Sequence, residues 1–98
     1  MGSSLKSAQF LIDSKRADAA RGNAQAAYEL GMVYASGADG NDVDLVLAHK
    51  WFNIAAMNGS RRAQECRAEI AEDMTAREIA DAQKRARAWL HRSIPHAA

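Results

Sequence analysis

Apolar residues recur every three to four positions along most of the chain, and this spacing predicts amphipathic α-helices rather than strands. The clearest case begins after Asn23, a residue type that favours the N-cap position of a helix. Four apolar residues then fall on one helical face: Ala26, Leu30, Val33 and Tyr34. Gly37 follows where a left-handed residue would end the helix. We therefore predict a helix between Asn23 and Gly37.

Two further helices follow. One is predicted between Asp44, its expected N-cap, and Gly59, and the preceding segment ADGND has the composition of a turn. Its expected buried residues are Leu47, Ala48, Trp51, Phe52, Ala55 and Ala56. The next helix begins at Ser60, and its apolar face is expected to carry Ala63, Cys66, Ile70 and Met74.

The segment MTAREI marks the start of the last helix. Thr75 and Glu78 have the spacing of a capping box, and Met74 and Ile79 have that of a hydrophobic staple. The helix cannot continue past Pro95, and its expected buried side carries Ile79, Ala82, Ala86, Trp89 and Leu90. Near the amino terminus, residues 5–21 predict one more helix, whose apolar residues are Leu5, Phe10 and Leu11. The pattern thus predicts five helices and no strand.

Two short patterns recur at nearly the same distance. A-x-x-G-x-x-x-A occurs at residues 19–26 and again, 37 residues later, at 56–63. A-x-x-W occurs at residues 48–51 and again, 38 residues later, at 86–89. This period is typical of solenoids built from two-helix repeats.

Residues 19–63 resemble the Sel-1-like repeat, a relative of the tetratricopeptide repeat. The matching positions are Ala19, Gly22, Ala26, Leu30, Gly31, Tyr34, Gly37, Asp44, Ala48, Trp51, Ala55, Ala56 and Gly59. The loop between the two helices is one residue longer than the family pattern. The unit that follows keeps Gly59, Ala63, Ala86 and Trp89, but Arg67, Ala68 and Ala71 replace the Leu-Gly and Tyr of the family.

The resemblance implies an all-α, right-handed α-α superhelix, a short solenoid of about two and a half repeats. Residues 1–98 would then form a single domain. We expect residues 5–21 to be an amino-terminal half-repeat, 23–58 a full repeat, and 60–92 a degenerate carboxy-terminal capping hairpin. Terminal repeats of solenoids are atypical because one of their faces meets water.

Gly31 is predicted in the middle of a helix, where glycine costs about 0.5–1 kcal/mol relative to alanine. This cost is tolerable if a facing helix lies too close for a Cβ atom. We expect Trp51 and Phe52 to fill that place and so join the two helices of residues 23–58. Ala55 and Ala56 would then contact the next hairpin.

The composition limits the classes of function that the sequence favours. The 13 basic and 12 acidic residues leave a net charge of +1, which gives no overall attraction to nucleic acid or an anionic membrane. The single cysteine cannot form an intramolecular disulfide. No apolar run reaches the roughly 18 residues of a membrane span. The sequence shows no signal peptide, so we expect a cytoplasmic protein; a periplasmic or secreted one would need a leader missing from this sequence.

The sequence gives little sign of catalysis. His49, His91 and His96 lack metal-ligand spacing, and we expect them to be exposed or associated with helix caps. Cys66 lies between Ala63 and Ile70 on an apolar face, as a small core residue would. Glu72 and Asp73 are expected on a helix surface, and SGADG lacks the lysine of a phosphate-binding loop. We therefore expect no catalytic residue, metal or cofactor.

A non-catalytic protein-interaction module, an adaptor or scaffold, is the predicted function. The resemblance implies peptide or protein binding on the concave face, in bacterial signalling or cell-envelope processes. The face would be lined by Gln25, Glu29, Met32, Ser36, Arg62, Cys66, Glu69 and Asp73. Of these, the predicted contacts are Glu29, Met32, Arg62 and Glu69. The alternative interpretation is that these side chains form an ordinary solvent-exposed face of the helices.

Three alternatives remain open. The basic segment KRARAWLHR on the last helix, with Lys84, Arg85, Arg87 and Arg92, allows nucleic-acid binding, although Glu78 and Asp81 precede it. Trp89 is expected to be buried under the preceding hairpin and therefore withdrawn from base stacking. A small thiol-dependent hydrolase would require a reactive Cys66. Short solenoids can also self-associate end to end.

Overall fold

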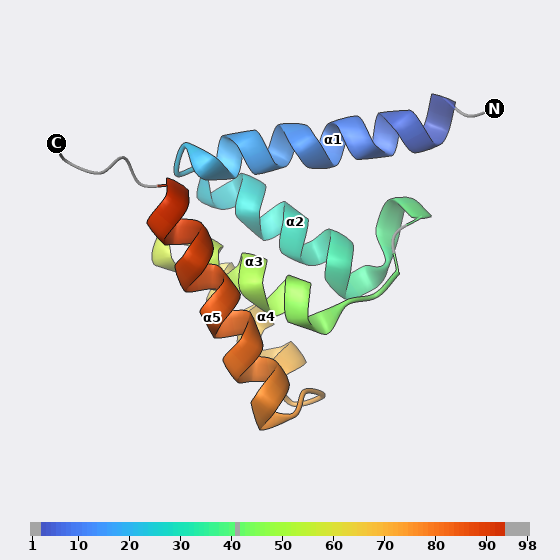
Figure 1. Cartoon of the computed structure of the whole chain (residues 1–98). Helices are drawn as coiled ribbons and strands as arrows, with labels where there is room; N and C mark the ends of the chain where they lie inside the picture. Colours follow the sequence, from blue (N-terminus) through green and yellow to red (C-terminus); the bar gives the residue numbers. More distant parts are fainter. Residues whose placement is uncertain (1–2, 41, 94–98) are drawn as a thin grey trace, which may run out of the picture.

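The computed structural model describes residues 3–40 and 42–93, and the regular structure in these ranges is entirely helical. The five α-helices are α1 (Ser3–Ala20), α2 (Ala24–Ser36), α3 (Leu45–Met57), α4 (Arg61–Ala71) and α5 (Ala76–Ser93). A short 3-10 helix, η1 (Ala38–Gly40), lies between α2 and α3 (Figure 1). The predicted all-α class with five helices is confirmed for this part of the chain. Pro95 and His96, and the side chain of Leu5, lie outside it.

The predicted N-caps Asn23 and Asp44 are confirmed, and Ser60, the predicted start of the next helix, is its N-cap. The side-chain oxygens of Asn23, Asp44 and Ser60 each accept a hydrogen bond from the backbone N–H three residues later, at 3.0, 3.0 and 3.1 Å. Each cap of this kind stabilises a helix by about 1 kcal/mol. Gly37 ends α2 with a φ of 71°, as predicted for a left-handed C-cap. Local chemistry therefore determines where these helices begin and end.

The predicted capping box at the start of α5 is also present. Thr75 Oγ1 accepts a hydrogen bond from the Glu78 N–H at 3.1 Å, and Glu78 Oε1 accepts one from the Thr75 N–H at 2.8 Å. The preceding helix is shorter than predicted, since α4 ends at Ala71 and Met74 lies in the turn before α5. Met74 and Ile79 are both half-buried.

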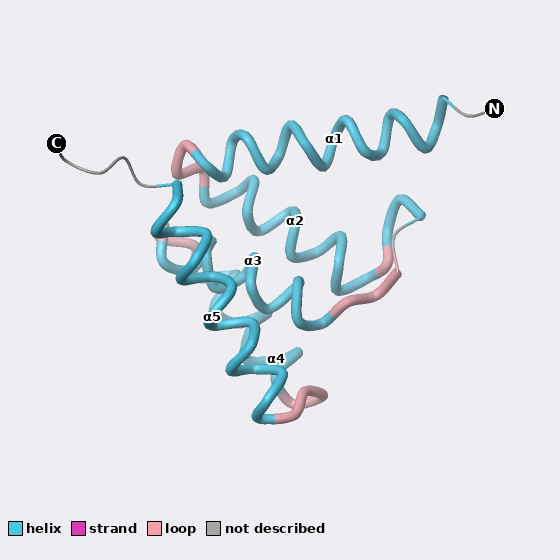
Figure 2. The backbone as a smooth tube through the Cα atoms, in the orientation of Figure 1, coloured by secondary structure: helices cyan, strands magenta, loops and turns pink. Residues whose placement is uncertain are grey.

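Helix α3 is the centre of the molecule. It packs against α2, α4 and α5, while α1 packs against α2 (Figures 1 and 2). Helices α4 and α5 make few contacts with each other, and each lies mainly against α3. Consequently α3 is buried on most of its circumference, through Ala48, His49, Trp51, Phe52, Ile54 and Ala55. The consecutive helices thus share one core instead of forming separate pairs.

The close approach predicted at Gly31 is confirmed for Phe52. A Cβ atom on Gly31 would overlap the Cδ1 and Cε1 atoms of the Phe52 ring and lie 3.0 Å from its Cγ. The prediction for Trp51 is wrong, because this side chain packs against Trp89 of α5. Neighbouring residues of an α-helix point about 100° apart, so the two rings can face different helices. Phe52 therefore joins α2 to α3, and Trp51 joins α3 to α5.

Helix α1 packs through fewer residues than its apolar content suggests. Ile12 and Ala19, two helical turns apart, are buried, whereas Phe10 is 70% exposed and Leu11 is 51% exposed. The stripe that carries Ile12 and Ala19 faces the rest of the molecule, because α1 packs mainly against α2, with a smaller contact to η1. The apolar residues Phe10 and Leu11 therefore do not form the packed face of α1.

Candidate functional site

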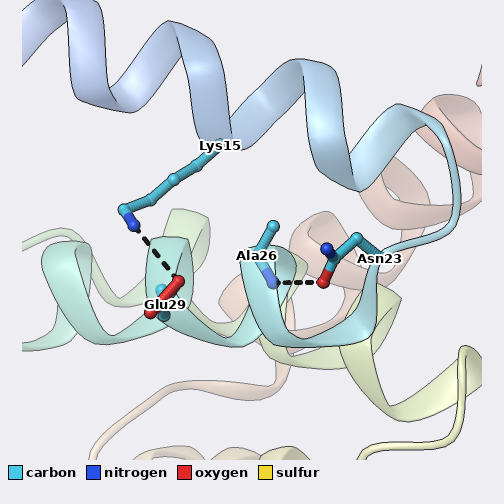
Figure 3. Close-up of polar contacts among 4 residues, drawn as sticks. All are labelled: Lys15, Asn23, Ala26 and Glu29. Atoms are coloured by element: carbon cyan, nitrogen blue, oxygen red, sulfur yellow. Dashed lines mark hydrogen bonds and ion pairs between the residues drawn. The ribbon is translucent and has the colours of Figure 1, made fainter.

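The predicted partner contacts lie on α2 and α4, which touch each other beside α3. The structure gives Glu29 a partner within the chain: Lys15 Nζ of α1 lies 3.1 Å from Glu29 Oε1 (Figure 3). Both side chains are partly exposed, and exposed ion pairs contribute at most about 1 kcal/mol. Glu29 thus marks the edge of α2 that faces α1.

The opposite edge of α2 faces α4. The Arg62 guanidinium carbon lies 5.8 Å from the centre of the Tyr28 ring, a cation–π arrangement. Tyr28 in turn lies near Phe52, with ring centres 5.9 Å apart. Arg62 therefore lies over the seam between α2 and α4 and is placed by an aromatic ring that the core holds.

Between these edges α2 presents a stripe of exposed side chains, Gln25, Met32 and Ser36. Met32 is 41% exposed, and its carbonyl oxygen accepts a hydrogen bond from the Ser36 hydroxyl at 2.7 Å. On α4 Glu69 is exposed and Cys66 half-buried, while Asp73 lies in the turn that follows. Within the described part of the chain, no hydrogen bond or ion pair joins any two of Glu29, Met32, Arg62 and Glu69. These four residues, two on α2 and two on α4, therefore form no cluster held together by hydrogen bonds or ion pairs.

The prediction that the histidines are exposed or cap-associated is wrong for His49. Its side chain is 3% exposed, and its Nδ1 atom has no hydrogen-bond partner. Burial lowers the pKa of His49 below its ordinary value, and the nearby charge of Arg67 lowers this pKa further. Arg67 Nη1 donates a hydrogen bond of 2.5 Å to Asn53 Oδ1, so it is held beside α3. The neutral imidazole is therefore the favoured form of His49.

The other residues that were considered as catalytic groups or metal ligands lie on different parts of the structure. His91 is exposed on α5, and Glu72 and Asp73 are exposed at the end of α4. Within residues 3–40 and 42–93, no group of three or more His, Cys, Asp or Glu side chains is placed to hold a metal ion. None of the helices in these ranges is both long and apolar enough to cross a membrane.

The structure brings together one cluster that the sequence does not predict, which we name the Trp–cation cluster: Arg16, Lys50, Trp51, Arg85, Trp89 and Arg92. The two tryptophan rings meet edge to face, with centres 4.8 Å apart and planes at 70°. Lys50 Nζ lies 4.6 Å from the Trp51 ring centre and 5.3 Å from that of Trp89. The Arg16 guanidinium carbon lies 5.8 Å from the Trp89 ring centre.

The cluster concentrates positive charge in one place, although the whole chain has a net charge of only +1. Burial lowers the pKa of Lys50, and the positive charges of Arg16, Arg85 and Arg92 lower it further. Arg85 Nε has an acidic partner, Asp81 Oδ1, at 3.1 Å. The recurring A-x-x-W pattern pointed to both tryptophans. Lys50 directly precedes Trp51 on α3 and Arg16 lies on α1, but nothing in the sequence indicated that either would approach Trp89 of α5.

Comparison of this chain with protein-family models, with curated proteins and with solved structures finds no match. The Sel-1-like resemblance therefore rests on the residue pattern alone.

Proposed function

We propose that this chain is a non-catalytic protein-interaction module, a short right-handed α-solenoid of the Sel-1-like kind, and that it binds a peptide or protein segment across α2 and α4. The family resemblance suggests an adaptor role in bacterial signalling or cell-envelope processes. The observation that carries the proposal is that α2 and α4 both pack against α3 and make a small contact with each other. In a stacked array of helix pairs, the first helices of successive pairs lie next to each other and line one face.

The chemistry of this surface supports the proposal. An exposed apolar side chain, Met32, lies on α2, and an arginine held by an aromatic ring, Arg62, lies at the seam. Methionine adapts its shape to a bound surface, and arginine is enriched at protein interfaces. The acidic side chain of Glu69 adds a charge on α4. A partner segment with an apolar residue and an acidic residue would match Met32 and Arg62.

The carboxy-terminal helix supports the expected capping role of residues 60–92. Its outward residues are exposed and mostly polar: Arg77, Ala80, Gln83, Lys84 and Arg87. Such a face is suited to water and has little apolar surface for a further repeat. Its opposite side buries Ala82 and Ala86 against the core. Such a capped end leaves the face of α2 and α4 open to a partner.

The test is affinity capture from a bacterial lysate with three baits: the parent chain, Met32→Glu and Met57→Glu. Met57 is 66% exposed at the end of α3, so the same substitution there is a matched control outside the proposed surface. We expect a protein that the parent and Met57→Glu retain and Met32→Glu loses, with all three baits equally folded by circular dichroism. Retention of the same proteins by all three baits, or by none, would contradict the proposal.

A further inference from the structure

The Trp–cation cluster lies outside the surface of α2 and α4, since its residues come from α1, α3 and α5. On α5, Arg85, Trp89 and Arg92 follow one another at spacings of four and three residues, so they share one helical face. Arg16 and Lys50 approach the same tryptophan from α1 and α3. Arg16 and Lys50 thus meet at Trp89, and the charges of Arg85 and Arg92 lie near enough to act on Lys50.

The positive charges in this cluster are poorly neutralised. Among the described residues, Arg85 pairs with Asp81, while Arg16, Lys50 and Arg92 have no carboxylate within ion-pair distance. The rings attract Arg16 and Lys50 through their faces, and this attraction holds the cations without removing their charge. Burial lowers the pKa of the Lys50 ammonium group, and the positive charges of Arg16, Arg85 and Arg92 lower it further. An anion at this place would gain contacts and relieve the repulsion.

We propose that the Trp–cation cluster binds an anionic segment of a protein partner, one that carries clustered carboxylate or phosphate groups. Arginine clusters recognise such segments through charge-assisted hydrogen bonds. The site is separate from the face of α2 and α4, so this proposal does not depend on the proposed function.

A peptide fits the cluster better than a nucleic acid does. Proteins that bind single-stranded nucleic acid offer free aromatic faces on which bases stack. Here Trp51 is 2% exposed, and Trp89 packs edge to face against it, with Lys50 and Arg16 over its ring. The rings are therefore already occupied, and a net charge of +1 provides little long-range attraction for a polyanion. A short acidic segment needs only the converging cations.

The chain contains two tryptophans, both in the cluster, so intrinsic fluorescence reports directly on binding. The probes are a blocked hexaglutamate peptide, a phosphoserine-containing peptide of equal length, and a hexaglutamine peptide as the neutral control. We expect a saturable change in tryptophan emission with both anionic peptides and none with hexaglutamine. Tighter binding of the phosphorylated peptide would identify a phosphorylated segment as the source, whereas equal or tighter binding of hexaglutamate would identify an acidic one.

Two double variants on α5 have the same change in net charge. Arg85→Gln with Arg92→Gln removes cluster residues, whereas Lys84→Gln with Arg87→Gln removes exposed residues outside the cluster. We expect about tenfold weaker peptide binding for the cluster variant and less than twofold for the control, because one exposed charge pair contributes a factor of about three. Arg16→Gln, on α1, should weaken binding about threefold. Circular dichroism establishes that all variants are folded.

Three results would overturn the proposal. One is the absence of saturable binding of either anionic peptide to the parent chain. Another is equal weakening by the two double variants, which would indicate unspecific attraction to a basic helix. The third is tighter binding of hexauridylate than of either peptide, with the same dependence on Arg16, Arg85 and Arg92, which would make the cluster a nucleic-acid site.

Discussion

Replacement of Gly31 by alanine tests the packing of α2 against α3. Glycine is normally the poorer residue in a helix, so Gly31→Ala should stabilise α2 by about 0.5–1 kcal/mol if nothing opposed it. Packing in the structure works against this gain in stability, because the new Cβ would overlap two carbon atoms of the Phe52 ring. Phe52 is 1% exposed and is among the largest fully buried side chains, so its ring has little room to move.

The expected change in the free energy of unfolding follows from two opposing contributions, helix propensity and overpacking of the core. Overfilling a well-packed core by a methyl-sized group costs about 1–3 kcal/mol. Subtracting the helix-propensity gain leaves a net loss of about 1 kcal/mol in the free energy of unfolding, with an upper end near 2 kcal/mol. For a chain of this length, that loss lowers the melting temperature by about 4–8 °C per kcal/mol. The expected sign is therefore opposite to the one that helix propensity predicts.

Urea unfolding followed by circular dichroism measures the effect, and a double-mutant cycle assigns its cause. In a Phe52→Leu background the ring is gone, so Gly31→Ala should become neutral or stabilising, with a coupling energy of about 1–2 kcal/mol. Ala68→Gly, at an exposed position of α4, measures the propensity term in the same protein. Stabilisation by Gly31→Ala in the parent chain, or an unchanged cost in the Phe52→Leu background, would refute the reasoning.

Three further predictions concern a cap, a ring pair and a titrating group. Thr75→Ala should lower the free energy of unfolding by about 1 kcal/mol, measured by urea unfolding, because the first turn of α5 loses its side-chain acceptor; an unchanged value would contradict the cap. Leucine at Trp51 and at Trp89, singly and together, should reveal a coupling energy of about 0.5–1.5 kcal/mol from the edge-to-face contact, and strict additivity would contradict it. Stability should fall as the pH drops below about 6.5 and level off below the native pKa of His49. As the pH falls, the His49 imidazole takes up its proton in the unfolded chain before it does so in the native protein, because the native pKa is lowered. The free energy of unfolding then changes by at most about 1.4 kcal/mol per pH unit. The slope should weaken in His49→Asn and persist in His91→Gln, and the reverse pattern would contradict this assignment.

Features governed by neighbours in sequence could be predicted from the sequence. The N-caps at Asn23, Asp44 and Ser60 depend on a side chain and a backbone N–H three residues apart, so each is visible locally. The contact of Gly31 with Phe52 was also predictable, because a glycine in the middle of a helix indicates a close neighbour. Local signals of this kind therefore predict where helices begin and one interface between helices, that of α2 with α3.

Features governed by the way in which helices meet could not be predicted. Whether Phe10 is exposed depends on the number of neighbours of α1, and periodicity does not reveal that number. His49 is buried because three helices surround α3, although its own sequence neighbours include Lys50. The Trp–cation cluster combines α1, α3 and α5, so no single segment contains its pattern. The candidate surface on α2 and α4 was predicted through the family resemblance and not from local signals.

Site-specific photo-crosslinking tests the central claim most directly, namely that a partner binds across α2 and α4. A photoreactive phenylalanine analogue replaces Met32 in one variant and Met57 in another, and both are irradiated in bacterial cells. Met32 is exposed on α2 beside the seam, whereas Met57 is exposed at the end of α3. We predict a discrete protein adduct from position 32 that is absent from position 57. The same adducts from both positions, or an adduct from position 57 alone, would contradict the account.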